Sequence, residues 1–136
     1  MDNSRFKFRL WDKELNRFIF TNGWNYVMSF DSDVYMTNYE ASNLDIFNIS
    51  DYVVVTQSTG LYDCEGKEIW EQDIVKYQTY LDEGIALMTW CSNLACYKLA
   101  VNKGDGLWHE INYPVPDWRY KVIGNRFENP ELLEGK

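Results

Sequence analysis

Short runs in which apolar and polar residues alternate, separated by turn-forming residues, recur along most of this chain. In the first run, residues 5–11, the apolar side chains of Phe6, Phe8 and Leu10 face one way and the basic side chains between them face the other. A period of two residues is typical of a β-strand with one solvated face. Further runs predict strands at residues 17–20, 24–30, 52–57, 67–70, 73–77, 85–91, 95–101 and 120–124.

The expected fold class is therefore all-β: a short-stranded sandwich or a partly open barrel with a minor helix. The sequence shows no long amphipathic helix and no internal repeat, and its length predicts a single domain over residues 1–136. A short helical turn is expected at the C-terminal end, because Asn129 is a favoured cap and Pro130 suits the first helical position.

Residues 31–51 fit this pattern least well. They are acidic and rich in Asn and Ser, with scattered apolar residues. We expect an acidic insertion or loop here, or a short helix over residues 41–48.

The composition excludes several classes of protein. The chain carries 13 Lys and Arg against 21 Asp and Glu, a formal charge of −8, which is unusual for a protein that binds nucleic acid through phosphate contacts. No apolar run approaches the roughly 18 residues of a membrane-spanning helix. The N-terminal residues lack the apolar stretch of a secretory signal. We therefore expect a cytoplasmic protein without a membrane partner.

Three cysteines, Cys64, Cys91 and Cys96, cannot all pair within one chain, so free thiols in a reducing compartment are expected. Cys91 and Cys96 with His109 make an incomplete zinc set, and Cys91 ends a strand-like run, so the thiols are interpreted as structural.

One basic strand face is a candidate nucleic-acid surface. It consists of Arg5, Lys7 and Arg9, with Trp11 adjacent. Small β-barrels bind single strands by stacking bases on aromatic rings in a basic groove. The negative total charge and the lack of a wider basic stripe argue against this reading, so it is kept as an alternative.

No catalytic constellation emerges from the sequence. His109, the single histidine, falls on an expected loop, and neither a nucleophile motif nor a Gly-rich phosphate loop is present. We expect no catalytic residue, no cofactor and no metal. A metal-dependent enzyme that uses carboxylates such as Asp63 and Asp73 is the third alternative.

Three segments together resemble the YopX family of phage and prophage proteins. They are FKFRLWD at residues 6–12, TGLYDCEGKEIWEQDIV at residues 59–75, and VIGNRFENPELL at residues 122–133. Each is similar to a block of that family, in the same order and at similar spacing. The family usually carries glycine where Gln72 stands, so we expect the turn there to be altered.

The resemblance implies a mainly β fold, a phage or prophage origin and assembly as a homo-oligomer, and it brings no catalytic residue. With 6 Trp, 10 Tyr and 7 Phe, the chain has more apolar surface than one small core hides, which also favours an interface. The expected role is a self-associating interaction module, with a host or phage protein as a possible partner. The motif residues expected to shape turns are Gly60, Asp63, Gly66, Asp73, Gly124, Asn125, Asn129 and Pro130.

Overall fold

The computed structural model describes residues 6–19, 25–40, 43–80, 82–102, 107–110 and 119–134, except for the side chains of residues 39, 40, 43 and 44. The chain forms two compact units: Arg9–Val55, here called the small unit, and Met1–Phe8 with Thr56–Lys136, here called the large unit. The chain passes from one unit to the other within strands β1 and β6. The single domain over residues 1–136 stays a prediction.

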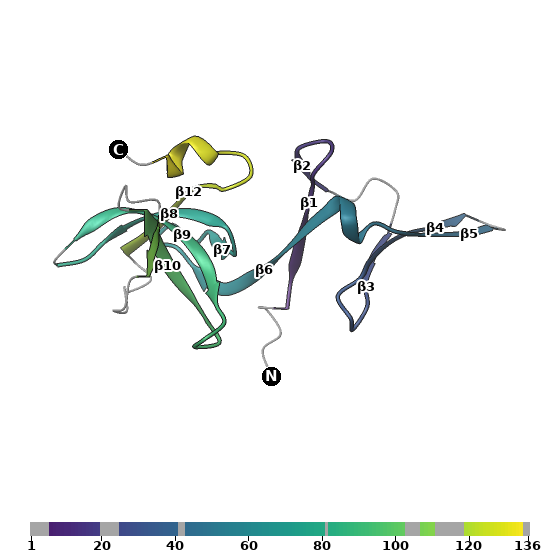
Figure 1. The fold of residues 1–136 in the computed structure, drawn as a ribbon, viewed down its shortest axis with the longest axis horizontal. Helices are drawn as coiled ribbons and strands as arrows, with labels where there is room; N and C mark the ends of the chain where they lie inside the picture. Colours follow the sequence, from purple (N-terminus) through teal and green to yellow (C-terminus); the bar gives the residue numbers. More distant parts are fainter. Residues whose placement is uncertain are drawn as a thin grey trace. The chain divides into compact units, whose positions relative to one another are not determined.

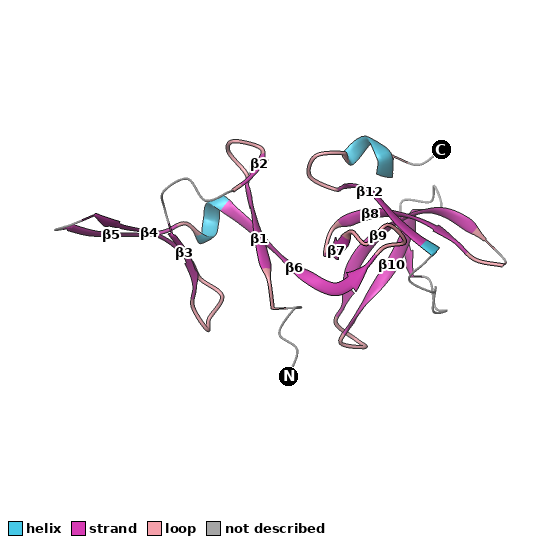
Figure 2. Ribbon diagram, turned by 180° about the vertical axis from the view of Figure 1, so that it is seen from behind, coloured by secondary structure: helices cyan, strands magenta, loops and turns pink. Residues whose placement is uncertain are grey.

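Strands dominate both units, which confirms the all-β prediction (Figures 1 and 2). The N-terminal elements are β1 (Phe8–Asp12), β2 (Arg17–Phe18), β3 (Asn25–Met28), β4 (Val34–Glu40), β5 (Asn43–Asn48) and the 3₁₀ helix η1 (Ser50–Tyr52). They are followed by β6 (Val53–Tyr62), β7 (Glu68–Trp70), β8 (Asp73–Gln78), β9 (Glu83–Cys91), β10 (Cys96–Asn102), β11 (Trp108–Glu110), β12 (Tyr120–Asn125) and the 3₁₀ helix η3 (Pro130–Leu133). The described part of the chain holds no helix long and apolar enough to cross a membrane.

The large unit is built on a five-stranded antiparallel sheet with the order β11-β10-β9-β8-β12. Figure 1 shows this sheet strongly curled, as expected for part of an open barrel. One face carries the core cluster, which consists of Ile69, Val75, Tyr77, Ala86, Met88, Leu99, Tyr120 and Val122. Full burial of one such aliphatic side chain contributes about 1.5–3 kcal/mol, so this face stabilises the unit.

A second sheet has the order β2-β1-β6-β7, and both β1 and β6 belong partly to each unit. In the large unit, β6 pairs with β7, with a register shift between Ser58 and Leu61. In the small unit, β1 pairs with β2, so that Trp11 faces Phe18.

The small unit also contains a three-stranded antiparallel sheet, β3-β4-β5 (Figure 2). Thus the loop or helix expected within residues 31–51 is wrong, because β4 and β5 form a hairpin there. Val34 and Thr37 of β4 are buried. Polar residues of this segment bond the backbone around the strands, as Ser50 shows by accepting the Val34 N–H through its Oγ at 2.9 Å.

The N-terminal strand buries a different residue than alternation indicated. Phe6 and Phe8 are 51% and 44% exposed, whereas Trp11 is 6% exposed. In the small unit Trp11 packs edge-on against Phe18, with ring centroids 5.0 Å apart. Alternation predicts the strand but does not tell which of its faces is covered.

Two further expectations are corrected. Trp108-His109-Glu110 is strand β11 and not a loop, since it pairs with β10. At the C-terminal end the helical turn η3 forms with Pro130 in its first turn, but the Asn129 side chain does not cap it. Some predicted features lie outside the described residues: Arg5, the Asn22-Gly23 turn, Pro114 and Pro116.

Candidate functional site

Asp63 lies at the turn between β6 and β7, and backbone N–H groups surround its carboxylate. Oδ1 accepts the N–H groups of Glu65 and Lys67, both at 2.9 Å, and Oδ2 accepts the N–H of Val122 at 2.9 Å. Cys64 donates its N–H to the carbonyl of Tyr120, also at 2.9 Å. This carboxylate therefore closes its own turn and fastens that turn to β12.

These bonds set the charge state of Asp63. Burial alone would raise its pKa, but the hydrogen bonds from Val122, Lys67 and Glu65 outweigh burial and hold the pKa below its ordinary value of 3.8. Hydrogen bonds to the charged form of a carboxyl group have this effect. The group is thus an ionised carboxylate whose two oxygens are both engaged by the protein.

The turn before β8 joins the second motif block to the third. Gln72 adopts φ of +70°, in the left-handed region that favours glycine. Its N–H donates to the Met88 carbonyl at 2.7 Å, and its carbonyl accepts the Arg126 N–H at 2.9 Å. Asp73, 2% exposed, accepts the Trp70 N–H at 2.8 Å and lies opposite Asn125 in the β8–β12 ladder. The left-handed turn therefore forms here with glutamine in place of glycine.

Asn125 and Asn129 organise the chain after β12. Asn125 Oδ1 accepts the N–H groups of Phe127 and Glu128 at 3.1 and 2.9 Å, and its Nδ2 donates to Glu128 Oε1 at 2.9 Å. Asn129 Oδ1 accepts the Asn125 N–H at 3.3 Å. A Cβ at Gly124 would meet Oδ1 of Asn129 and would lie 2.8 Å from its Cγ. The absence of a side chain at Gly124 leaves room for this amide.

Of the remaining motif glycines, Gly60 lies within β6 at the register shift between Ser58 and Leu61, and Gly66 lies in the turn before β7; their φ values are +75° and +79°. Taken together, the motif side chains bond backbone at the turns of the large unit. Among the described residues, no group of three or more His, Cys, Asp or Glu is placed to hold a metal ion.

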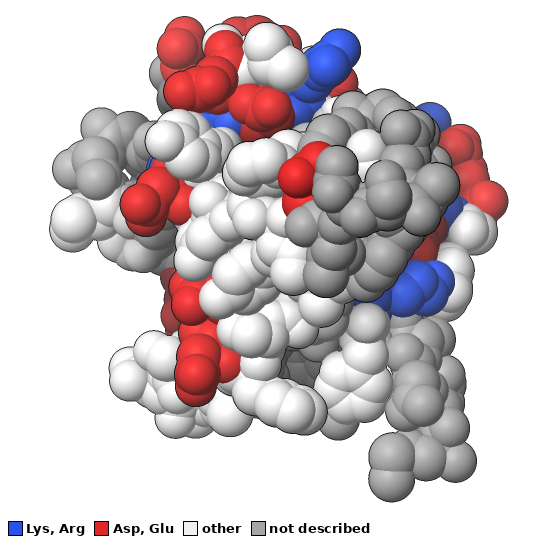
Figure 3. Space-filling model, turned by 90° about the vertical axis from the view of Figure 1, so that its right-hand side faces the viewer, with Lys and Arg blue, Asp and Glu red and all other residues white. Residues whose placement is uncertain are grey.

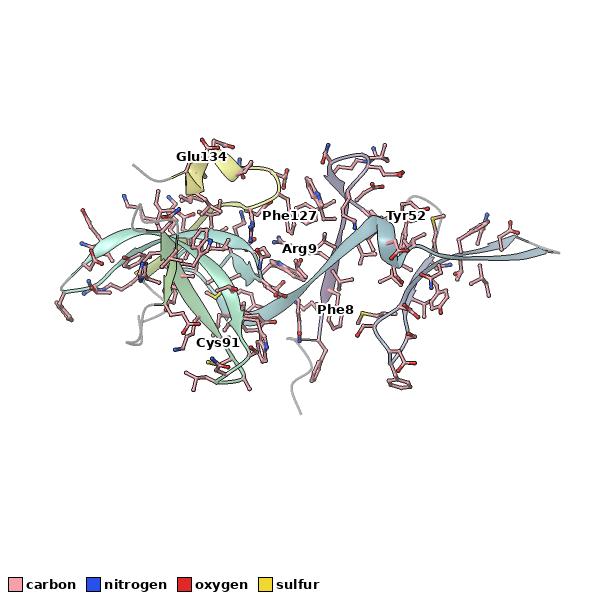
Figure 4. All side chains as sticks on the ribbon, in the orientation of Figure 1. Phe8, Arg9, Tyr52, Cys91, Phe127 and Glu134 are labelled. Atoms are coloured by element: carbon pink, nitrogen blue, oxygen red, sulfur yellow. The ribbon has the colours of Figure 1, made fainter. Side chains whose placement is uncertain are left out.

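The proposed nucleic-acid face is not assembled as a free basic strip. In the large unit, Lys7 Nζ bonds Glu68 Oε1 at 2.7 Å, and Glu68 also accepts the Ser58 hydroxyl at 2.8 Å. In the small unit, the guanidinium of Arg9 lies 4.6 Å from the centre of the Phe18 ring (Figure 4). Trp11 is buried against the same ring, so it is not available to stack on a base.

These contacts lower the pKa of the Glu68 carboxyl group. Burial alone would raise its pKa, but the hydrogen bonds from Lys7 and Ser58 outweigh burial and lower the pKa below its ordinary value of 4.5. Glu68 and Lys7 therefore form a charged pair that ties the N-terminal residues to β7.

Each unit has a cavity on its surface. The cavity of the small unit has a volume of about 850 Å³, within the range of small-molecule sites. Aromatic and aliphatic side chains line it, among them Phe18, Tyr26, Met36 and Tyr52, and its charged members are Asp12, Glu14 and Arg17. Asp12 Oδ1 already accepts the N–H groups of Glu14 and Leu15. The cavity of the large unit, about 470 Å³, lies between η3 and the sheet beside Trp108.

A polar cluster on the large sheet was not predicted from the sequence. Cys91 and Cys96 lie directly opposite each other in the β9–β10 ladder, and Figure 4 labels Cys91 near one end of the two strands. Lys98 Nζ lies 3.1 Å from Glu110 Oε2 of β11. The bond to Glu110 raises the pKa of Lys98, with contributions in the same direction from Cys91 and Cys96. Glu110 has a lowered pKa because it accepts hydrogen bonds from Lys98 and from the Cys91 thiol.

The β3-β4-β5 sheet presents apolar side chains to solvent. Val27, Met28, Ile46 and Phe47 are all exposed, with Ile46 at 54%. Figure 3 views the right-hand side of Figure 1, where β4 and β5 are labelled, and shows uncharged side chains across its middle. Because neighbouring residues of a strand point to opposite faces, Val27 and Ile46 lie on one face of this sheet and Met28 and Phe47 on the other.

Comparison with known proteins identifies the family. The sequence profile of the family described as "YopX protein" matches residues 7–134. The chain belongs to the YopX family. This confirms the resemblance seen in the three motif blocks. No curated protein matches the chain significantly.

Two solved structures of similar fold accompany the family match. Protein yopX from Bacillus subtilis is 17% identical, with a TM-score of 0.60 over 97% of this chain and 98% of that one. Protein EF1440 from Enterococcus faecalis is 24% identical, with a TM-score of 0.56 over 94% of this chain and 97% of that one. At these identities the two similarities show the YopX fold.

Proposed function

We propose that this YopX-family chain is a non-enzymatic interaction module that associates with further copies of itself through the β3-β4-β5 sheet. The observation that carries the proposal is the apolar, weakly charged edge strand β5, in which Ile46 and Phe47 are exposed. A further host or phage protein is the second kind of partner proposed.

An edge strand offers unpaired backbone N–H and C=O groups to any strand that approaches it. Among the described strands, β5 lies at the edge of its sheet and pairs with β4. Monomeric proteins usually protect such edges with charges, prolines or bulges. Within Asn43–Asn48 the single charged residue is Asp45. The strand thus carries little of the protection expected of a permanently solvated edge.

The sequence of β5 suits pairing with the β5 strand of a second copy of the chain. Two antiparallel β5 strands related by a two-fold axis at Ile46 would place Ile46 against its counterpart. In that register Asp45 lies opposite Phe47 of the second copy, so the two Asp45 carboxylates do not face each other. Cross-strand apolar pairs contribute roughly 0.2–1 kcal/mol each, and the paired backbone adds to them.

The non-enzymatic part of the proposal is supported by the motif residues. Both oxygens of Asp63 are engaged by backbone N–H groups, and Asn125 bonds its own turn. Membership in the YopX family supports a phage or prophage origin as part of this proposal. A cytoplasmic location is supported by the three cysteines, which are all free thiols.

The test is the mass of the protein in solution. Light scattering on the purified chain at micromolar concentration should give a multiple of 16.2 kDa, and Ile46→Lys should shift the mass toward that of one chain. Leu94→Lys, at an exposed leucine of the large unit, is the matched control and should leave the mass unchanged. A wild-type mass of a single chain would refute self-association. An unchanged assembly of folded Ile46→Lys would refute β5 as the interface.

A further inference from the structure

Cys91 and Cys96 occupy opposite positions at the last pair of the β9–β10 hairpin. Residues directly opposite in an antiparallel ladder have Cα atoms about 4.5–5.5 Å apart. A disulfide requires Cα atoms about 4.4–6.8 Å apart. The two side chains also point to the same face of the sheet, since opposite residues share a face. The backbone of this hairpin is therefore already suited to a disulfide.

The thiol pair lies on the face of the sheet opposite to the core cluster. Met88 and Leu99 are opposite each other and belong to the core cluster. Alternation along β9 and β10 puts Cys91 and Cys96 on the other face, together with Lys98. A bond between the sulfurs would therefore form outside the core cluster, on a face where Leu87 and Ala100 are also buried.

The two thiols differ in access to solvent. Cys91 is buried and Cys96 is half-buried, so a small oxidant in solution reaches Cys96 first. Cys91 then needs no access to solvent, because its reaction partner is the sulfur across the ladder. Glu110 of β11 lies opposite Ala100 and therefore on the same face of the sheet as the two thiols.

We propose that Cys91 and Cys96 form a peroxide-sensitive dithiol that closes to a cross-strand disulfide. The Cys96 thiolate attacks one oxygen of hydrogen peroxide, an S–O bond forms, the O–O bond breaks, and hydroxide leaves to become water. The Cys91 sulfur then attacks the resulting sulfenic acid. The S–S bond forms as the S–O bond breaks, and the departing hydroxide takes the Cys91 proton as a second water. In total, two thiols are oxidised and one peroxide is reduced to two waters.

The experiment uses the full chain carrying Cys64→Ser, which removes the exposed third thiol. The reduced protein receives one equivalent of hydrogen peroxide, and thiols are counted after denaturation. Both remaining thiols should be lost, while the intact mass falls by two hydrogen atoms and no oxygen is gained. Trypsin should place the change in the fragment of residues 77–98, which contains both cysteines. Treatment with a thiol reductant should restore both thiols.

Two controls make the result specific to the fold. With Cys91→Ser added, Cys96 should gain oxygen and become trappable as sulfenic acid. With the pair intact but the protein unfolded in guanidinium chloride, closure should be slower. Two titratable thiols after peroxide would overturn the proposal, and so would oxygen gain at Cys96 while Cys91 is present. Equal closure rates in the folded and unfolded chain would show that the hairpin geometry plays no part.

Discussion

The Oδ2 atom of Asp63 accepts a hydrogen bond from the backbone N–H of Val122 at 2.9 Å, although 59 positions separate the two residues in the sequence. This contact connects the second motif block of the chain with the third. The turn after β6 is thereby held against strand β12. The carboxylate of Asp63 stabilises the fold through this bond. Gln72 and Asn125 also have structural roles, through the hydrogen bonds that they make at their own turns.

Replacing Asp63 with Asn should destabilise the chain by about 1–3 kcal/mol, the usual effect of weakening hydrogen bonds to a charged group. Thermal unfolding measures the loss. Because we assign Asp63 a structural role, the metal content of the purified protein should be the same for wild type and Asp63→Asn. Bound metal in the wild type that disappears in the variant would favour the metal-dependent enzyme instead.

The pH dependence of unfolding provides a second measurement on Asp63. Its pKa is lowered in the folded state, so the folded chain binds this proton less readily than the unfolded chain. The resulting stability is complete above the ordinary value of 3.8 and is lost as the pH falls through the folded pKa. Between about pH 5 and about pH 3, the free energy of unfolding should therefore fall less in Asp63→Asn than in the wild type. Glu68 also has a lowered pKa, so part of the acid sensitivity should remain, and Glu68→Gln should remove that part.

Gly124→Ala should destabilise the protein, because the new methyl group would displace the Asn129 amide from the Asn125 N–H. Overpacking of this kind costs about 1–3 kcal/mol. In a chain that already carries Asn129→Ala, the same change should cost clearly less. Denaturant unfolding of the four proteins gives the coupling free energy. Additive effects would show that the two positions do not interact.

Gln72→Gly should stabilise the chain by roughly 0.5–1 kcal/mol, since a left-handed conformation costs more for glutamine than glycine loses in chain entropy. The side chain of Gln72 makes one long bond, 3.4 Å from Arg126 Nη1, so little is lost with it. Gln72→Ala is the matched control and should bring no gain. A lower melting temperature for Gln72→Gly would mean that the glutamine side chain supports the turn.

Filter binding with a single-stranded oligonucleotide tests the alternative function. Lys7 pairs with Glu68 and Arg9 covers Phe18, so we expect no retention at two salt concentrations and no difference for Lys7→Glu or Arg9→Glu. Retention that decreases with salt and disappears in both variants would show that the basic residues bind phosphate.

Local patterns in the sequence predicted the strands of the large unit well. Residues 73–77, 85–91 and 120–124 lie within β8, β9 and β12, because β-branched and aromatic residues bounded by turn signals are a short-range property. The hairpin that contains Cys91 and Cys96 could also have been predicted from the sequence, since the two predicted strands that contain them are separated by a short turn.

The β4–β5 hairpin was missed because its apolar residues, such as Val34, Tyr35 and Met36, stand next to one another and do not alternate with polar residues. The contacts of Asp63 with Val122 and of Gln72 with Arg126 were missed for another reason. They join positions far apart in the chain, and no local pattern states which distant backbone group a carboxylate will bond. The buried face of the N-terminal strand was predicted wrongly for the same reason. Trp11 is buried because it packs against Phe18, a contact that the strand's own sequence does not indicate.

The most direct test of self-association through β5 is amide hydrogen exchange at several protein concentrations, followed by mass spectrometry of peptides from residues 43–48. If a second copy pairs with this strand, exchange in this segment should slow as the concentration rises, and Ile46→Lys should abolish the concentration dependence. Peptides of the buried strand β8 should be unaffected by concentration. Exchange in residues 43–48 that stays equally fast at every concentration, while light scattering shows an assembly, would contradict the account.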